Sequence, residues 1–343
     1  MTKQKNRFED NSKKTVVLFA SILIISDFLI GTILIPPSYR LQDCYFHHGL
    51  TKNFKGKIKW FGSKYSVYTN SLGFRDSVNR IVRPVSNKYR ILFIGDSFAE
   101  GIGVIYDKTF VGIIDKALHE QNIEVLNAGV VGYSPKLYYL KIKYLIEKEG
   151  LKFNELYVYI DISDIPDEIG YENYRPQKRC ILTKINNLLR GHSVIYNMMS
   201  YIPILYRNVI SKFHKPQIDS WTQDEIVFNK RGKKGLLLAK NNMDMLLGLC
   251  KKYGIKVTLA VYPWPSQIKN NGINSPQVLF WEDYCRKKGI GFINYFPDFI
   301  NDLPDETINK YFLKDDFHWN EKGHRIIAQK WLEFYGQRNA LNM

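Results

Sequence analysis

The chain has 343 residues, of which 45% are hydrophobic and 24% are charged, and its formal net charge is +16. This composition excludes a disordered or collagen-like chain and provides enough apolar material for one large folded core. The basic excess favours polyanionic partners such as envelope polysaccharide or lipid headgroups, although charge spread this thinly is equally compatible with simple solubility. Nucleic acid is not favoured, because the sequence contains no nucleic-acid recognition motif.

An apolar run from Val16 to Ile35, about 20 residues long, could cross a hydrocarbon layer of roughly 30 Å. Basic residues precede it, so we expect a cytoplasmic tail at residues 1–15 and a single-pass anchor at residues 16–35 of the cell membrane. The remainder would be extracytoplasmic. A buried core helix and a cleaved signal peptide are the alternatives, but Ile35-Pro36-Pro37 offers no small-x-small cleavage site. Asp27 is an unusual charge in such a run and is expected to face a partner helix or to be protonated.

Regular secondary structure is expected only after residue 88. Residues 36–88 are polar, aromatic and irregular, and we expect them to wrap the domain as a lead-in with His47 and His48 on its surface. Short apolar runs then alternate with helical spacing. Strands are expected at 90–95, 123–126, 155–160, 255–261 and 290–294, and helices at 109–120, 135–150, 235–253, 278–288 and 320–334.

This alternation predicts right-handed crossovers and a parallel sheet that is covered on both faces. The predicted fold class is α/β, a three-layer α/β/α flavodoxin-like sandwich with a central parallel five-stranded sheet, plus the N-terminal transmembrane helix. The domain is expected to cover residues 89–337. Residues 166–234 interrupt the alternation and are expected to form an inserted cap over one end of the sheet. A free-standing second domain is the alternative.

The cysteines do not indicate a metal site. Cys44, Cys180, Cys250 and Cys285 are widely spaced and form no Cys/His cluster with zinc spacing. The predicted compartment permits disulfides, but the sequence does not pair these residues, and buried free thiols are equally compatible with it.

The first candidate for chemistry is Gly95-Asp96-Ser97, directly after the strand at 90–95. Ligands of open α/β sheets bind at the carboxyl ends of the strands, where a serine in a tight strand-to-helix turn is exposed. The start of the following helix could supply N–H groups and a positive dipole end for an oxyanion. A lone serine at such a turn is more often only a helix cap.

Two further strand ends carry polar or glycine-rich loops. Asn127-Ala-Gly-Val-Val-Gly132 could bring a backbone N–H close to a substrate oxygen, although turn formation alone would also explain its glycines. Asp161-Ile-Ser163-Asp164 could aim the Ser163 hydroxyl into the same crevice, but polar residues are common at strand ends. These glycines do not form a nucleotide-binding motif.

A histidine loop precedes the last helix in the stretch Asp315-Asp316-Phe317-His318-Trp319. An aspartate three residues before His318 can accept the Nδ1 proton while Nε2 takes the proton of a serine. A serine hydroxyl needs such a base, because it is a poor nucleophile by itself. His324, six residues later, is expected to be a packing residue of the last helix.

The order of these motifs resembles the sequence blocks of the SGNH/GDSL hydrolase superfamily. The order is Gly-Asp-Ser, then a glycine loop, then a polar loop similar to Gly-x-Asn-Asp, and finally Asp-x-x-His. The resemblance covers residues 89–331, and residues 70–76 resemble the lead-in of membrane-anchored bacterial members. It implies Ser97 as nucleophile, His318 as base and Asp315 as its partner. It also implies an oxyanion hole formed by Ser97, Gly132 and Ser163.

Two departures from the family pattern leave alternatives open. Ser163 stands where the family usually has asparagine, so Ser163 or a water substitutes, or the enzyme is slow, or activity has been lost. Asp316-Phe-His318-Trp319 also resembles the DxHW signature of the alginate-acetylation branch, in which the aspartate stands two residues before the histidine. Asp315 and Asp316 therefore compete for one role, and Asp315 is preferred.

The resemblance implies a serine esterase, and together with the anchor it favours O-acyl esters, O-acetyl above all, of cell-envelope carbohydrate. An O-acyltransferase that uses the same site and an inactive carbohydrate-binding scaffold are the alternatives. Tyr262, Trp264 and Trp319 are candidates for the substrate rim, although plain packing would also explain them. No metal and no cofactor is expected. The membrane and a carbohydrate or other acyl ester are the expected partners, and the oligomeric state stays open.

Overall fold

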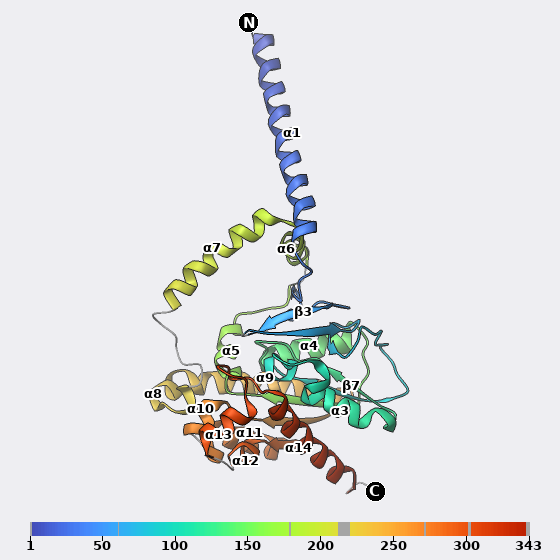
Figure 1. Ribbon diagram of the computed structural model, residues 1–343, viewed down its shortest axis with the longest axis vertical. Coiled ribbons are helices and arrows are strands. Elements are labelled where there is room, and N and C mark those ends of the chain that lie inside the picture. Colours follow the sequence, from blue (N-terminus) through green and yellow to red (C-terminus); the bar gives the residue numbers. More distant parts are fainter. Residues whose placement is uncertain are drawn as a thin grey trace. The chain divides into compact units, whose positions relative to one another are not determined.

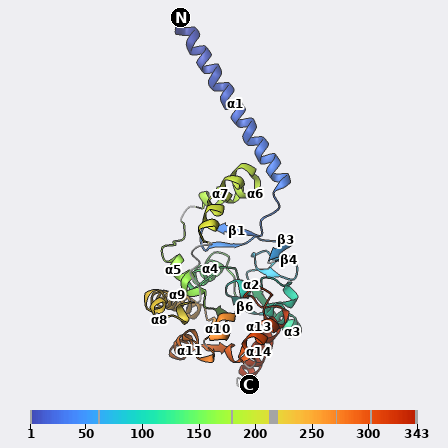
Figure 2. The same ribbon diagram turned by 60° about the vertical axis from the view of Figure 1, so that its left-hand side comes forward.

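The computed structural model describes residues 2–60, 62–177, 180–211, 220–270, 272–300 and 303–340. The chain divides into two compact units (Figures 1 and 2). Residues 1–44 and 177–215 form the first, called here the anchor unit. Residues 45–176 and 216–343 form the second, called here the sheet unit.

The anchor unit is built on one long apolar helix. Helix α1 spans Thr2–Leu34, and its part from Ser12 to Leu34 is predominantly apolar. It is long and apolar enough to be a signal sequence or a single membrane anchor. The unit also contains β1 (Arg40–Asp43), α6 (Ile181–His192) and α7 (Val194–Ser211). A disulfide between Cys44 and Cys180 links the two chain segments of this unit.

The sheet unit contains a sheet of eight strands in the order β10-β9-β8-β6-β7-β5-β4-β3. Its parallel part confirms the predicted strands: β6 (Tyr89–Ile94), β7 (Ile123–Asn127), β8 (Glu155–Ile160), β9 (Lys256–Val261) and β10 (Gly291–Asn294). In chain order these five strands lie as 2-1-3-4-5, which is the flavodoxin-like arrangement.

The five predicted parallel strands do not make up the whole sheet. Strands β3 (Lys55–Trp60), β4 (Ser63–Thr69) and β5 (Arg75–Asp76) extend it in antiparallel fashion, so the sheet is mixed. The lead-in at 36–88 is therefore not irregular throughout. Residues 55–60 alternate between exposed and half-buried side chains, but the exposed positions are lysines, which are depleted in strands.

Helices cover both faces of the sheet, as predicted. On one face lie α4 (Pro135–Glu147), α9 (Lys233–Lys252) and α11 (Pro276–Lys288), and Tyr284 of α11 donates a hydrogen bond to Asp244 of α9. On the other face, α3 (Phe110–Leu118) packs against α14 (Glu321–Ala340). Trp331 of α14 is fully buried against the sheet residue Tyr157, with ring centroids 5.0 Å apart.

Shorter elements fill the connections of the sheet unit. They are β2 (His47–Leu50), α2 (Ser97–Glu100), η1 (Tyr106–Lys108), η2 (His119–Gln121), α5 (Asp164–Tyr171), η3 (Ser220–Thr222), α8 (Glu225–Val227), η4 (Phe228–Gly232), α10 (Pro265–Asn270), η5 (Gly272–Asn274), α12 (Phe296–Phe299) and α13 (Pro304–Tyr311).

The segment predicted as one cap at 166–234 is divided between the two units. Residues 177–215 belong to the anchor unit, because α6 and α7 pack on α1. The rest belongs to the sheet unit, where Trp221 donates a hydrogen bond of 2.9 Å to the Ile162 carbonyl. Residues 178–179 and 212–219 lie outside the described residues. An interruption of the strand and helix alternation marks an insertion but does not say where it packs.

Candidate active site

Ser97 stands at the carboxyl end of β6, where crowding requires a glycine. A Cβ on Gly95 would lie 3.0 Å from the Tyr159 carbonyl oxygen of the neighbouring strand. Asp96 caps the following turn by accepting the Phe98 N–H at 2.9 Å. Helix α2 is only one turn long, so the positive dipole end that was expected there is weak.

The structure brings Ser97 and His318 together from positions 221 residues apart. His318 Nε2 lies 2.8 Å from Ser97 Oγ, and His318 Nδ1 lies 2.9 Å from Asp316 Oδ1. Because a carboxylate only accepts, Nδ1 carries the proton, which leaves Nε2 to accept the Ser97 hydroxyl proton. Both Ser97 and His318 are buried, with exposed fractions of 5% and 2%.

The preferred histidine partner, Asp315, is not the one that the structure pairs with His318. Asp315 is exposed and has a φ of 60°, at a turn where the Asp316 N–H bonds back to the Leu313 carbonyl. This turn directs Asp315 to solvent and returns Asp316 to the imidazole. The alternative aspartate, Asp316, is therefore the partner, as in the DxHW pattern.

Trp60 is a site residue that sequence reasoning missed. Its Nε1–H donates to Asp316 Oδ2 at 2.7 Å, and its ring meets the His318 ring edge-on, with centroids 5.5 Å apart. Burial raises the pKa of Asp316, but the hydrogen bonds from His318 and Trp60 outweigh it and hold that pKa below its usual value. Trp60 comes from β3, and nothing local in the sequence connects it with a loop 256 residues away.

The glycine loop is held by a histidine pair. Gly132 has a φ of 70°, which favours glycine, and its carbonyl accepts the Tyr171 hydroxyl at 3.0 Å. The preceding Val131 carbonyl accepts from His48 Nε2 at 2.8 Å, and His48 Nδ1 lies 2.8 Å from His47 Nδ1. The carbonyl of one peptide plane points opposite to its N–H, so His48 sets the direction of the Gly132 N–H. The histidines are half-buried rather than on the surface, contrary to expectation.

Ser163 uses its hydroxyl locally. Its N–H and its hydroxyl both donate to Asp161 Oδ1, each at 2.7 Å. The hydroxyl proton is therefore directed at Asp161 and not at an incoming oxyanion.

Two carboxyl groups near Ser97 are buried, those of Asp96 and Asp161. Asp96 accepts from Tyr262 at 3.0 Å, and Asp161 accepts from Trp264 at 2.6 Å. Burial raises the pKa of both groups, and the charge of Asp161 raises the pKa of Asp96 further. Asp96 Oδ2 also lies 3.2 Å from Ser97 Oγ, so Asp96 helps to position this hydroxyl.

The three aromatic residues expected at the substrate rim are buried instead. Tyr262 and Trp319 have exposed fractions of 0% and Trp264 of 7%. The exposed aromatic is Phe317, at 36%. It stacks on Trp264 with centroids 4.1 Å apart and lies 4.4 Å from the His318 ring. Phe317 therefore presents an apolar surface next to the base.

The lead-in also packs against the turn that carries Ser97. Arg75 of β5 is buried, with an exposed fraction of 1%, and donates to the carbonyl of Glu100 at 2.7 Å and to that of Val104. Glu100 ends the helix α2 that Ser97 begins, and Val104 lies in the loop that follows it. The Asn70–Asp76 segment, singled out in the sequence, thus packs an arginine under the site.

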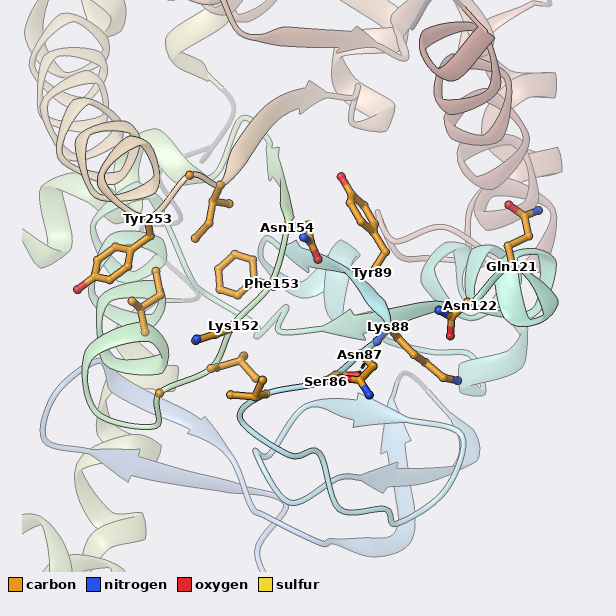
Figure 3. A pocket seen from close by; sticks show the side chains of 16 residues that line it. Ser86, Asn87, Lys88, Tyr89, Gln121, Asn122, Lys152, Phe153, Asn154 and Tyr253 are labelled. Atoms are coloured by element: carbon orange, nitrogen blue, oxygen red, sulfur yellow. Dashed lines mark hydrogen bonds between the residues drawn. The ribbon is translucent and has the colours of Figure 1, made fainter. Parts of the chain in front are cut away.

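A hollow of about 840 Å³ lies at the opposite edge of the sheet (Figure 3). Tyr89, Asn122, Asn154 and Ile255 line it, and these residues stand at the amino ends of β6, β7, β8 and β9. It is therefore separate from the edge that carries Ser97 and His318. In the part of the chain that the structure describes, no group of three or more His, Cys, Asp or Glu side chains is placed to hold a metal ion.

No family model and no curated protein matches the chain. The chain is similar in structure to GDSL-type lipolytic proteins. A member of the lipolytic G-D-S-L family from Veillonella parvula is 14% identical with a TM-score of 0.43, covering 71% of this chain and 97% of that one. The psychrotrophic esterase EstA from Pseudoalteromonas is 11% identical with a TM-score of 0.42, covering 75% and 100%. A GDSL-like lipase from Bacteroides thetaiotaomicron is 12% identical with a TM-score of 0.41, covering 75% and 93%.

Proposed function

We propose that this chain is a serine ester hydrolase with Ser97 as nucleophile, His318 as general base and Asp316 as the group that orients the base. The observation that carries this proposal is the continuous contact from Asp316 through both nitrogens of one imidazole to the Ser97 hydroxyl. An arrangement in which the base touches the nucleophile and is held by a third group is the signature of an activated serine.

In the proposed reaction, His318 takes the Ser97 proton while Oγ attacks the ester carbonyl. The N–H groups of Ser97 and Gly132 hold the oxyanion, and the imidazolium returns the proton to the leaving alcohol. Water then repeats the sequence on the acyl-serine, releasing the acid and restoring the enzyme. Phe317 is the side chain that would contact the substrate beside the base.

For the substrate we propose O-acyl esters, chiefly O-acetyl, of cell-envelope carbohydrate, with the sheet unit outside the cytoplasmic membrane. The basic flank before the apolar helix supports that orientation, and the net charge of +14 after residue 35 supports an anionic polymer. The same side chains would serve an O-acyltransferase if a sugar hydroxyl replaced water in the second step.

A fluorophosphonate probe tests the nucleophile directly, because it forms a covalent bond only with an activated serine. We expect the purified full chain to be labelled, and we expect Ser97→Ala and His318→Ala to be unlabelled. Absence of labelling in the intact, folded chain would favour the carbohydrate-binding scaffold and reject the enzyme.

Substrate and reaction type need a second experiment. O-acetylated oligosaccharide is supplied with and without an unacetylated acceptor, and free acetate and acetylated acceptor are both measured. Acetate release that the acceptor does not change supports the hydrolase. Transfer of the acetyl group to the acceptor would make the protein an acyltransferase.

A further inference from the structure

The charged residue inside the apolar helix α1 has partners in the chain itself. The Asp27 carboxylate accepts the Ser193 hydroxyl at 2.5 Å and the Ile195 N–H at 3.0 Å. These groups lie at the start of α7, so Asp27 caps that helix from the side of α1. Thr32, one turn further along α1, contacts His192 Nδ1 at 3.0 Å.

Close backbone packing accompanies these polar contacts. Gly31 of α1 is buried, and a Cβ at this position would lie 1.9 Å from the His192 carbonyl oxygen. Any larger residue would push α1 away from the turn between α6 and α7. Small residues and side-chain hydrogen bonds are the features that join helices inside a membrane.

The contact lies at a depth that belongs to the hydrocarbon layer. Asp27 precedes Leu34, the end of α1, by seven residues, which is about 10 Å at a rise of about 1.5 Å per residue. If Ser12–Leu34 fills a layer of roughly 30 Å, the start of α7 lies well inside its outer half.

The remaining surface of the two helices suits that environment. On the polar side of α6, Asn187 donates to the Gln42 carbonyl at 2.8 Å within the anchor unit, whereas Lys184 and Arg190 are exposed. Outside this polar side, apolar side chains are exposed on both helices: Ile181, Leu182, Ile185 and Leu188 on α6, and Ile195, Met198, Met199, Tyr201 and Ile202 on α7. An apolar face opposite a polar one is typical of a helix that lies in a bilayer interface.

We propose that α6 and the first half of α7 are embedded in the lipid bilayer beside α1, in the leaflet next to Leu34. Their apolar side chains contact lipid, and Asp27 and Gly31 attach them to the anchor. Lipid is then the partner of this surface, in place of the cap role over the sheet that was expected for residues 166–234. The proposal requires α1 to be retained in the mature protein rather than cleaved. It does not depend on the proposed esterase activity.

The test places an environment-sensitive fluorophore on Met199→Cys and, separately, on Leu182→Cys in the full chain, in nanodiscs that hold one copy each. Labelling is selective because the native cysteines are either disulfide-bonded or buried. Nitroxide-bearing lipid and aqueous iodide serve as quenchers, and a label on exposed Lys251→Cys of α9 is the aqueous reference. We expect lipid nitroxide to quench both labels and iodide to quench them several-fold less than the reference.

Three results would overturn the proposal. Iodide quenching of both labels at the level of the reference would place the helices in water. Protection of both labels from both quenchers would mean that protein, rather than lipid, covers this face. A mature protein that begins after Leu34 in cells would remove the helix to which α6 and α7 attach.

Asp27 offers a matched pair of variants. Asp27→Asn keeps an oxygen that can accept from Ser193 and Ile195, whereas Asp27→Leu keeps the bulk and removes the cap. We expect Asp27→Leu to raise iodide quenching of the Met199 label several-fold and Asp27→Asn to leave it within about twofold of the parent. Equal behaviour of the two variants would contradict the role of the cap.

Discussion

Asp316→Asn is the change that separates the observed partner of His318 from its neighbour in the sequence. Asp316 accepts from His318 Nδ1 and from Trp60 Nε1, but an amide of the same size has only one accepting oxygen. If the amide nitrogen faces His318, the ring takes the tautomer with its proton on Nε2 and can no longer accept from Ser97. If it faces Trp60, two buried donors oppose each other.

The structure sets the expected size of the effect. His318 contacts Ser97 only through Nε2, so loss of the correct tautomer disables the base while binding and the backbone N–H donors remain. We expect kcat/KM to fall by about 10³–10⁴-fold, as for loss of the aspartate in a Ser-His-Asp triad. That is about 4–5.5 kcal/mol of transition-state stabilisation.

The assay is hydrolysis of a p-nitrophenyl ester, with thermal unfolding to show that each variant is folded. Asp315→Asn is the matched control, because it makes the same chemical change one residue away. Asparagine tolerates the φ of 60° at that position, so we expect activity within about twofold of the parent. A large loss in Asp315→Asn with little loss in Asp316→Asn would refute the assignment of the histidine partner.

A Trp60→Phe variant tests the same assignment more specifically. Trp60→Phe removes the competing donor, so in the double variant the amide introduced by Asp316→Asn is free to present its oxygen to His318. We therefore expect Trp60→Phe alone to lose less than about tenfold activity, and to restore at least part of the activity that Asp316→Asn loses. Additive losses would show that Trp60 does not constrain the orientation of the side chain at position 316.

Three further predictions follow from the surroundings of the site. His48→Leu removes the hydrogen bond to the Val131 carbonyl and should lower kcat by about tenfold without raising KM. His48→Gln can still donate this hydrogen bond, so its kcat should fall less. Equal losses of kcat in the two variants would exclude orientation of the glycine loop by this hydrogen bond. Phe317→Ala should raise KM several-fold for aromatic or long-chain esters and leave the rate of fluorophosphonate labelling within about threefold, and an unchanged KM would exclude contact with substrate. Burial raises the pKa of Asp167 to about 7, and the nearby acids Asp161 and Glu168 add to this. The folded state therefore loses stability as pH rises from about 4 to 7. Asp167→Asn should be about 1–3 kcal/mol more stable than the parent at pH 8 but not at pH 4. Urea unfolding of both proteins at pH 4 and at pH 8 will check this.

The sequence alone determined the features that depend on short-range patterns. Five buried apolar runs alternating with helical spacing were sufficient for the parallel core, because strand and helix periodicities are local. The same holds for the apolar helix α1 and for the serine at the end of β6. His318 could be chosen because its loop stands next to the last helix and contains the aspartates that an imidazole needs.

Only the tertiary structure decided between Asp315 and Asp316, because both can reach a histidine in an extended loop and the turn at Leu313 selects one of them. Only the tertiary structure also showed that Trp60 contacts Asp316. Trp60 lies on an antiparallel strand in which exposed lysines alternate with half-buried residues, so its sequence does not read as a strand.

The same is true of the anchor unit. The pairing of Cys44 with Cys180 and the contact of Asp27 with Ser193 join residues more than 130 positions apart. Local patterns specify which element a residue belongs to, whereas the partner of a buried polar side chain depends on which distant element packs against it.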